Sequence, residues 1–132
     1  MRRPCRDERG AATVEFALIL PLLVLLVFGI VQFSLAYNRQ QGLHAAAREG
    51  ARMASLPSTT ADEVEQRVED ALDGMSFESG WTTTITPSAA QPCAGNSGET
   101  VVVRVEADNT IDVPFLEAPS VTLTGRGEFR CE

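Results

Sequence analysis

Between Phe16 and Tyr37 the chain runs for 22 residues without a charged side chain. A helix of that length rises about 33 Å at 1.5 Å per residue, which matches the hydrocarbon thickness of a bilayer. Its apolar residues occupy all sides of the helix rather than one stripe, as expected of a helix surrounded by lipid. The rest of the chain is too small to bury such a helix, so we predict one membrane span at about residues 16–37.

Charge is distributed unevenly around this span. Residues 1–56 carry seven Arg and four acidic residues, a net charge of +3, whereas residues 57–132 carry four Arg and fourteen acidic residues, a net charge of −10. By the positive-inside rule, the arginines that precede the span predict a cytoplasmic N-terminus and an extracytoplasmic C-terminal part. The acidic C-terminal part argues against nucleic acid as a partner.

The chain divides into three segments. Residues 1–10 form a short basic leader. Residues 11–56 predict one long transmembrane and juxtamembrane helix, because no strong helix breaker follows the span until Pro57. Pro21 removes one backbone hydrogen bond and is expected to kink this helix, as membrane helices tolerate. Residues 58–132 predict a small extracytoplasmic domain, so the expected fold class is membrane-anchored α+β.

The outer domain is expected to hold one helix and an antiparallel sheet of three or four strands. Residues 58–60 offer N-cap oxygens, apolar residues at helical spacing follow, and Gly74 is a natural C-terminal stop. Alternation of apolar and polar side chains is clearest at residues 101–106. The strand-like runs are residues 81–87, 100–108, 110–116 and 120–131.

Small residues recur at every fourth position in the helix beyond the span: Gly42, Ala46, Gly50 and Ala54. Such spacing lets another backbone approach closely. We expect this small-residue ridge to pack against a partner helix or against the outer domain. The alternative is an alanine-rich helix that reflects helix propensity alone.

Two cysteines lie in the predicted extracytoplasmic part, where disulfides persist. Pairing Cys93 with Cys131 leaves no odd external thiol, and the bond would tie the loop at 88–99 to the last strand. We therefore expect this disulfide, with two free thiols as the alternative. Cys5 is expected to be cytoplasmic and free.

No residue pattern indicates catalysis. His44 is the only histidine, has no second metal ligand at a suitable spacing, and is expected to be an exposed helix residue. Neither a nucleophile motif nor a phosphate-binding glycine loop is present. We expect no enzymatic activity, no cofactor, no metal and no small-molecule substrate.

The most specific pattern stands at the start of the span. Gly10 ends the basic leader, and Glu15 is the fifth residue counted from Ala11, directly before Phe16. This arrangement resembles the N-terminus of type IV pilins and pseudopilins. Residues 8–54 as a set resemble the TadE-like family of tight-adherence (Flp) pilus assembly proteins, in the GAxxVEF start and the AAREGAR-type end.

The resemblance implies a minor pilin or pseudopilin that takes part in assembly of a tight-adherence (Flp, type IVb-like) pilus, with links to adhesion and secretion. It places the chain in the bacterial cytoplasmic membrane as a single-pass protein, or in the pilus. It implies cleavage between Gly10 and Ala11 by a prepilin peptidase, contacts with other pilin or pseudopilin subunits, and roles for Glu15 and Phe16 in assembly and recognition. Cleavage would create an α-amine on Ala11 that the Glu15 carboxylate could pair with.

Two alternatives stay open. The first is a single-pass membrane-anchored extracytoplasmic binding module without a pilus role, its leader uncut. The second is a secreted soluble domain cleaved before Tyr37, because residues 34–36 fit a small-x-small signal peptidase site.

Overall fold

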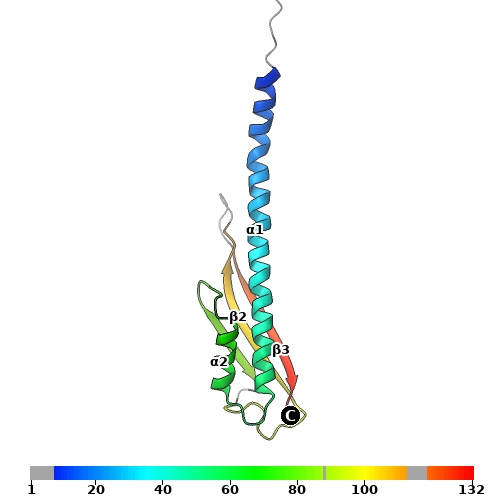
Figure 1. Cartoon of the computed structure of the whole chain (residues 1–132), viewed down its shortest axis with the longest axis vertical. Coiled ribbons are helices and arrows are strands. Elements are labelled where there is room, and N and C mark those ends of the chain that lie inside the picture. Colours follow the sequence, from blue (N-terminus) through cyan, green and yellow to red (C-terminus); the bar gives the residue numbers. More distant parts are fainter. Residues whose placement is uncertain (1–7, 88, 113–118) are drawn as a thin grey trace, which may run out of the picture.

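The computed structural model describes residues 8–87, 89–112 and 119–132. Figure 1 shows a long helical spine whose lower half is covered by a small sheet and a second helix, and whose upper half stands alone. The predicted layout, one long apolar helix followed by a small α+β unit, is confirmed. In chain order the elements within the described ranges are α1 (Glu8–Ala54), α2 (Ala61–Ala71), β1 (Trp81–Thr86), β2 (Thr100–Thr110) and β3 (Ser120–Arg130).

Helix α1 is a single element of 47 residues, about 70 Å long by its rise. Pro21 lies inside it, and the helix runs on past this residue. Every residue from Gly10 to Val24 is exposed. Within the described residues, α1 is the one helix long and apolar enough to cross a membrane.

The three strands form one antiparallel sheet in the order β1-β2-β3. Strands β2 and β3 pair along their whole length, from Thr100 opposite Arg130 to Thr110 opposite Ser120. The expectation of a separate strand at 110–116 is not met in the described part of that run. Thr110 ends β2, residues 111–112 belong to no strand, and residues 113–118 lie outside the described residues, as do residues 1–7 of the leader with Cys5.

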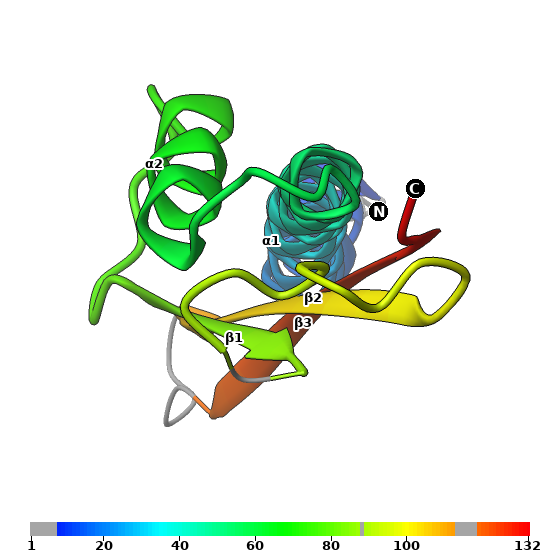
Figure 2. The ribbon, with the colours of Figure 1, turned by 90° about the horizontal axis from the view of Figure 1, so that it is seen from below.

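One face of the sheet is buried against the helices (Figure 2). In β2 the alternation expected of a half-buried strand is present, with Val101, Val103 and Val105 fully buried and Arg104 exposed between them. Burying each valine contributes about 1.5–3 kcal/mol relative to leaving it exposed.

The covered half of α1 supplies the opposite wall of this core. Leu43, Ala46, Ala47, Ala51 and Ala54 are buried there. The sheet therefore has no closed core without α1, so the folded unit is built from residues on both sides of the sequence boundary expected near residue 57.

Strand β3 approaches α1 through two glycines. A Cβ added at Gly125 would overlap the backbone carbonyl of Leu43, and one added at Gly127 would overlap that of Ala47. Because a strand alternates its faces, these two glycines point to the same side, and a side chain at either would push the sheet off the helix.

Helix α2 is fixed at its start and along its side. Thr60 and Glu63 form a reciprocal capping box, with the Thr60 N–H donating to the Glu63 carboxylate at 2.8 Å. Arg67 donates to the Glu49 carboxylate of α1 at 2.5 Å. Val64 and Val68 face the core. The N-cap and the apolar face expected for this helix are present, and α2 ends at Ala71, three residues before the expected stop at Gly74.

Two carboxylates of this region titrate below their ordinary range. The hydrogen bond and charge of Arg67 lower the pKa of Glu49, and hydrogen bonds from Thr60 lower the pKa of Glu63. A carboxylate whose pKa is lowered by folding stabilises the fold above its unfolded pKa, and this contribution is lost as pH falls through the folded value. The docking of α2 should therefore weaken only below about pH 4.3.

We predict that Gly127→Ala destabilises the fold by about 1–3 kcal/mol, because the added methyl group overlaps the α1 backbone. The measurement is guanidinium unfolding of the full chain in detergent, followed by the fluorescence of Trp81, the only tryptophan, which packs edge-on against Phe77. The control is Glu128→Ala, an exposed neighbour ion-paired to Arg126 at the surface, which should change stability by less than about 1 kcal/mol. Equal effects of the two variants would contradict the close packing.

We also predict that Arg67→Gln flattens the pH dependence of stability in the acid range. Urea midpoints of the original chain should fall as the pH drops below about 4.3, and the variant should show a smaller fall because Glu49 no longer has its charged partner. Arg104→Gln, which removes an exposed cation of β2, is the matched control and should keep the full acid dependence. Identical pH profiles for all three proteins would refute the role given to the Glu49–Arg67 pair.

Candidate functional site

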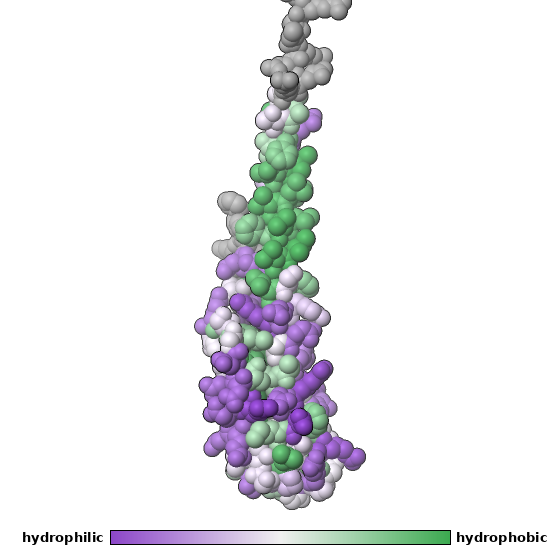
Figure 3. All heavy atoms as spheres, in the orientation of Figure 1, coloured by the Kyte–Doolittle hydropathy of each residue, from purple (hydrophilic) through white to green (hydrophobic). Residues whose placement is uncertain are grey.

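Glu15 lies on the uncovered half of α1, two turns from its start. It is the only charged residue between Gly10 and Asn38 and is exposed, as are its helix neighbours Val14 and Phe16. Figure 3 shows the apolar surface of this half of the helix above the polar surface of the sheet. A lone carboxylate on a surface suited to lipid is costly unless it meets a partner or reaches water.

The predicted cleavage point, Gly10–Ala11, lies within the first turns of α1. If the chain began at Ala11, its α-amine would stand about 6 Å along the helix axis from Glu15, one turn away. The carboxylate would then also benefit from the positive end of the helix dipole. The geometry thus allows an amine–carboxylate contact within one helix or between neighbouring helices.

The small-residue ridge of α1 is used inside the chain. Ala46, Gly50 and Ala54 are buried, and a Cβ at Gly50 would overlap the Val68 side chain of α2. Gly42 gives room in the same way to Met75. Of the two partners expected for this ridge, the structure places the folded unit of the same chain against it, so these positions are not free for a partner helix.

A second ridge of α1 covers the free edge of β3. Gln40 donates to the carbonyl of Thr124 at 2.6 Å, and the backbone N–H of Arg126 donates to Nδ1 of His44 at 3.4 Å. His44 is half-buried by this contact, which corrects the expectation of an exposed helix residue. Unpaired strand edges template association with other chains, so this side-chain cover protects the edge.

Cys93 and Cys131 are joined by a disulfide in the structure, with Cα atoms 5.4 Å apart. Backbone bonds hold the same region: Cys131 N–H donates to the Glu99 carbonyl at 2.8 Å, and Glu132 N–H donates to the Ser55 carbonyl at 3.0 Å. The loop before β2 and the end of β3 are thereby fixed to the end of α1.

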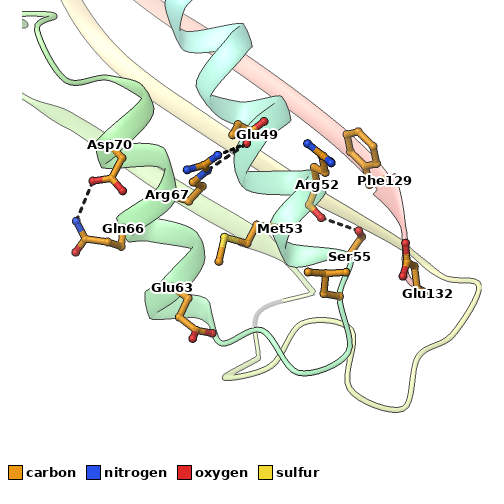
Figure 4. Close-up of a pocket in the computed structure, with 11 residues that line it drawn as sticks. Glu49, Arg52, Met53, Ser55, Glu63, Gln66, Arg67, Asp70, Phe129 and Glu132 are labelled. Atoms are coloured by element: carbon orange, nitrogen blue, oxygen red, sulfur yellow. Dashed lines mark hydrogen bonds and ion pairs between the residues drawn. The ribbon is translucent and has the colours of Figure 1, made fainter.

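An open groove of about 620 Å³ lies between α2 and the ends of α1 and β3 (Figure 4). Met53, Leu56 and Phe129 form its apolar strip, and the Glu49–Arg67 pair bridges its two helices. Ser55, the one hydroxyl among its lining residues, donates to the Arg52 carbonyl at 2.7 Å rather than facing a base. Among the described residues, no three His, Cys, Asp or Glu side chains cluster closely enough to hold a metal ion.

Sequence reasoning missed the two glycines of β3 and the edge cover by Gln40 and His44. The Gly-x-Gly alternation at 125–127 inside a strand-like run was the available signal, because glycine in a strand marks close approach of another backbone. The edge cover had no local signal, since its partners are more than eighty residues apart.

Comparison with known proteins supports the resemblance over the N-terminal helix. The family model described as TadE-like protein matches residues 10–52, roughly a third of the chain. The search of curated proteins and the search of solved structures gave no match. The matched segment holds Glu15, the apolar run and most of the small-residue ridge. The long N-terminal helix of this chain is therefore similar to the segment that the TadE-like family model describes.

Proposed function

We propose that the chain is a TadE-like minor pilin or pseudopilin that takes part in assembly of a tight-adherence (Flp, type IVb-like) pilus. The observation that carries this proposal is the division of α1, whose matched segment has one half locked into the folded unit and one half bare, apolar and marked by Glu15. A helix built in this way suits a subunit that waits in a membrane and later joins other helices.

In this proposal a prepilin peptidase cuts between Gly10 and Ala11. The new amine carries a positive charge near neutral pH, because an unperturbed α-amine has a pKa of about 8. Glu15 of one subunit pairs with the Ala11 amine of its neighbour, with Phe16 beside it. An unpaired carboxylate in hydrocarbon costs several kcal/mol, so the pairing sets the register of the helices during assembly.

The folded unit serves as an outer, non-catalytic contact surface in this scheme. It needs no cofactor, and its partners are other pilin or pseudopilin subunits. Its location follows from the positive-inside prediction, with the N-terminus in the cytoplasm and the sheet on the far side of the cytoplasmic membrane. The acidic charge of residues 57–132 supports a water-exposed surface.

We predict that Glu15→Gln, as the only copy of the protein, leaves membrane insertion intact but reduces the number of pili at least about tenfold, the change expected when roughly 1.4 kcal/mol of pairing energy is lost. Pili are counted by electron microscopy and membrane levels by immunoblotting. Glu65→Gln, which neutralises an exposed carboxylate of α2, is the matched control and should leave piliation unchanged.

Normal piliation with Glu15→Gln at normal membrane levels would show that the carboxylate has no assembly role. A chain found in the medium rather than in membranes would favour the secreted domain cleaved before Tyr37. A membrane-bound chain whose deletion leaves piliation unchanged would favour the anchored binding module.

A further inference from the structure

The β2–β3 hairpin runs beside α1 in a fixed register. Thr124 is bonded to Gln40 and Arg126 to His44, so two residues of β3 accompany four residues of α1. The rises agree, since two strand residues advance about 6.6 Å and four helix residues about 6.0 Å. The strand and the helix therefore keep the same axial register over the length of the hairpin.

Extending this register places Thr122 level with Ala36, and Ser120 level with Gln32. Gln32 and Ala36 are half-buried, whereas the residues between them are exposed, and half-burial recurs at Gly29 and Leu25, so it follows one face of α1 and the level of the hairpin end comes from the register alone. The described end of the hairpin, where Ile111 N–H donates to the Pro119 carbonyl at 3.3 Å, therefore stands near Gln32. Figure 1 shows the hairpin running up beside α1.

The hairpin end thus overlaps the last turns of the apolar run. Ser120 and Thr122 direct their backbone groups away from β2, like the neighbouring Thr124 and Arg126, and these groups would be costly in hydrocarbon. The hydrocarbon layer must then end near Gln32 on this side. A span of about twenty residues that ends there covers about residues 12–31 instead of 16–37.

We propose that the described end of the β2–β3 hairpin is a lipid-contact surface that rests in the headgroup layer and sets the depth of α1. The partner is the leaflet on the side of the sheet, and the proposal rests on the membrane anchoring assumed in the proposed function. The side chains fit this layer: Pro119 is exposed, Ile111 is half-buried, and Val121 is 42% exposed. Phe33 and Tyr37 of α1 add exposed aromatic rings at the same level, as membrane interfaces favour.

This depth has a consequence for Glu15. With the hydrocarbon layer covering about residues 12–31, Ala11 lies at its opposite boundary and Glu15 about 5 Å inside it. The contact of the hairpin with the headgroup layer then places the Glu15 carboxylate inside the hydrocarbon layer, while the Ala11 amine stays within reach of headgroup water. The hairpin would thereby increase the free-energy cost of leaving the Glu15 carboxylate unpaired.

The test measures depth in the membrane with spin labels. The full chain with Cys5→Ser, its Cys93–Cys131 bond intact, is placed in vesicles of phosphatidylethanolamine and phosphatidylglycerol. Single cysteines along α1 and at Val121 carry the nitroxide, and relaxation by oxygen and by a water-soluble nickel complex reports the depth of each. The deepest α1 position should lie near residue 21, against about residue 26 for a span of 16–37. The label at Val121 should be shielded from nickel relative to the control Glu128→Cys.

A deepest position near residue 26, or a label at Val121 as accessible to nickel as one at Glu128, would overturn the proposal. If Val121→Cys disturbs folding, Pro119→Cys at the same level replaces it with the same expected shielding. The spin-label measurement does not involve pili. Its result would therefore be the same if Glu15 proved to have no role in assembly. A chain that fails to float with the vesicles would contradict both the lipid contact and the membrane anchoring.

Discussion

The backbone of β3 rests directly on the backbone of α1, and the other contacts of the folded unit depend on that approach. Gly125 and Gly127 leave no side chain between strand and helix, and the overlap that a Cβ would create shows how little space remains. The same approach lets Gln40 and His44 reach the outer edge of β3. It also brings the valines of β2 against the alanines of α1, so a small chain gains a closed core from a helix that it shares with its apolar anchor.

This arrangement divides one helix between two environments. The lower half of α1 is packed on its small-residue ridge and cannot offer that ridge to another helix, whereas the upper half presents a mainly apolar surface that carries Glu15. In the proposed assembly, subunit contacts along the helix would therefore use the upper half or the faces of the lower half that the sheet and α2 leave open. Residues 10–52, which match the TadE-like family model, include parts of both halves.

Much of the fold could be predicted from the sequence, because its signals are local. The uncharged run predicted α1, the capping residues and apolar spacing predicted α2, and strand-like composition, with alternation in β2 and β3, predicted the three strands. The separate strand at 110–116 was wrong in its described part because Thr110 continues β2 to the end of its pairing with β3. The contact of the half-buried His44 with β3 and the position of the hairpin along α1 depend on pairing between distant segments, which no local pattern records. Glu15 was found from its spacing to Gly10, and the structure adds its isolation on the bare half of α1.

The most direct test of this account is the N-terminal residue and intact mass of the protein recovered from its native membranes. The account predicts a chain that begins at Ala11, which would supply the amine that Glu15 requires. A chain that still begins at Met1 would contradict processing and leave Glu15 without that partner. A chain that begins at Tyr37 would contradict the membrane helix itself.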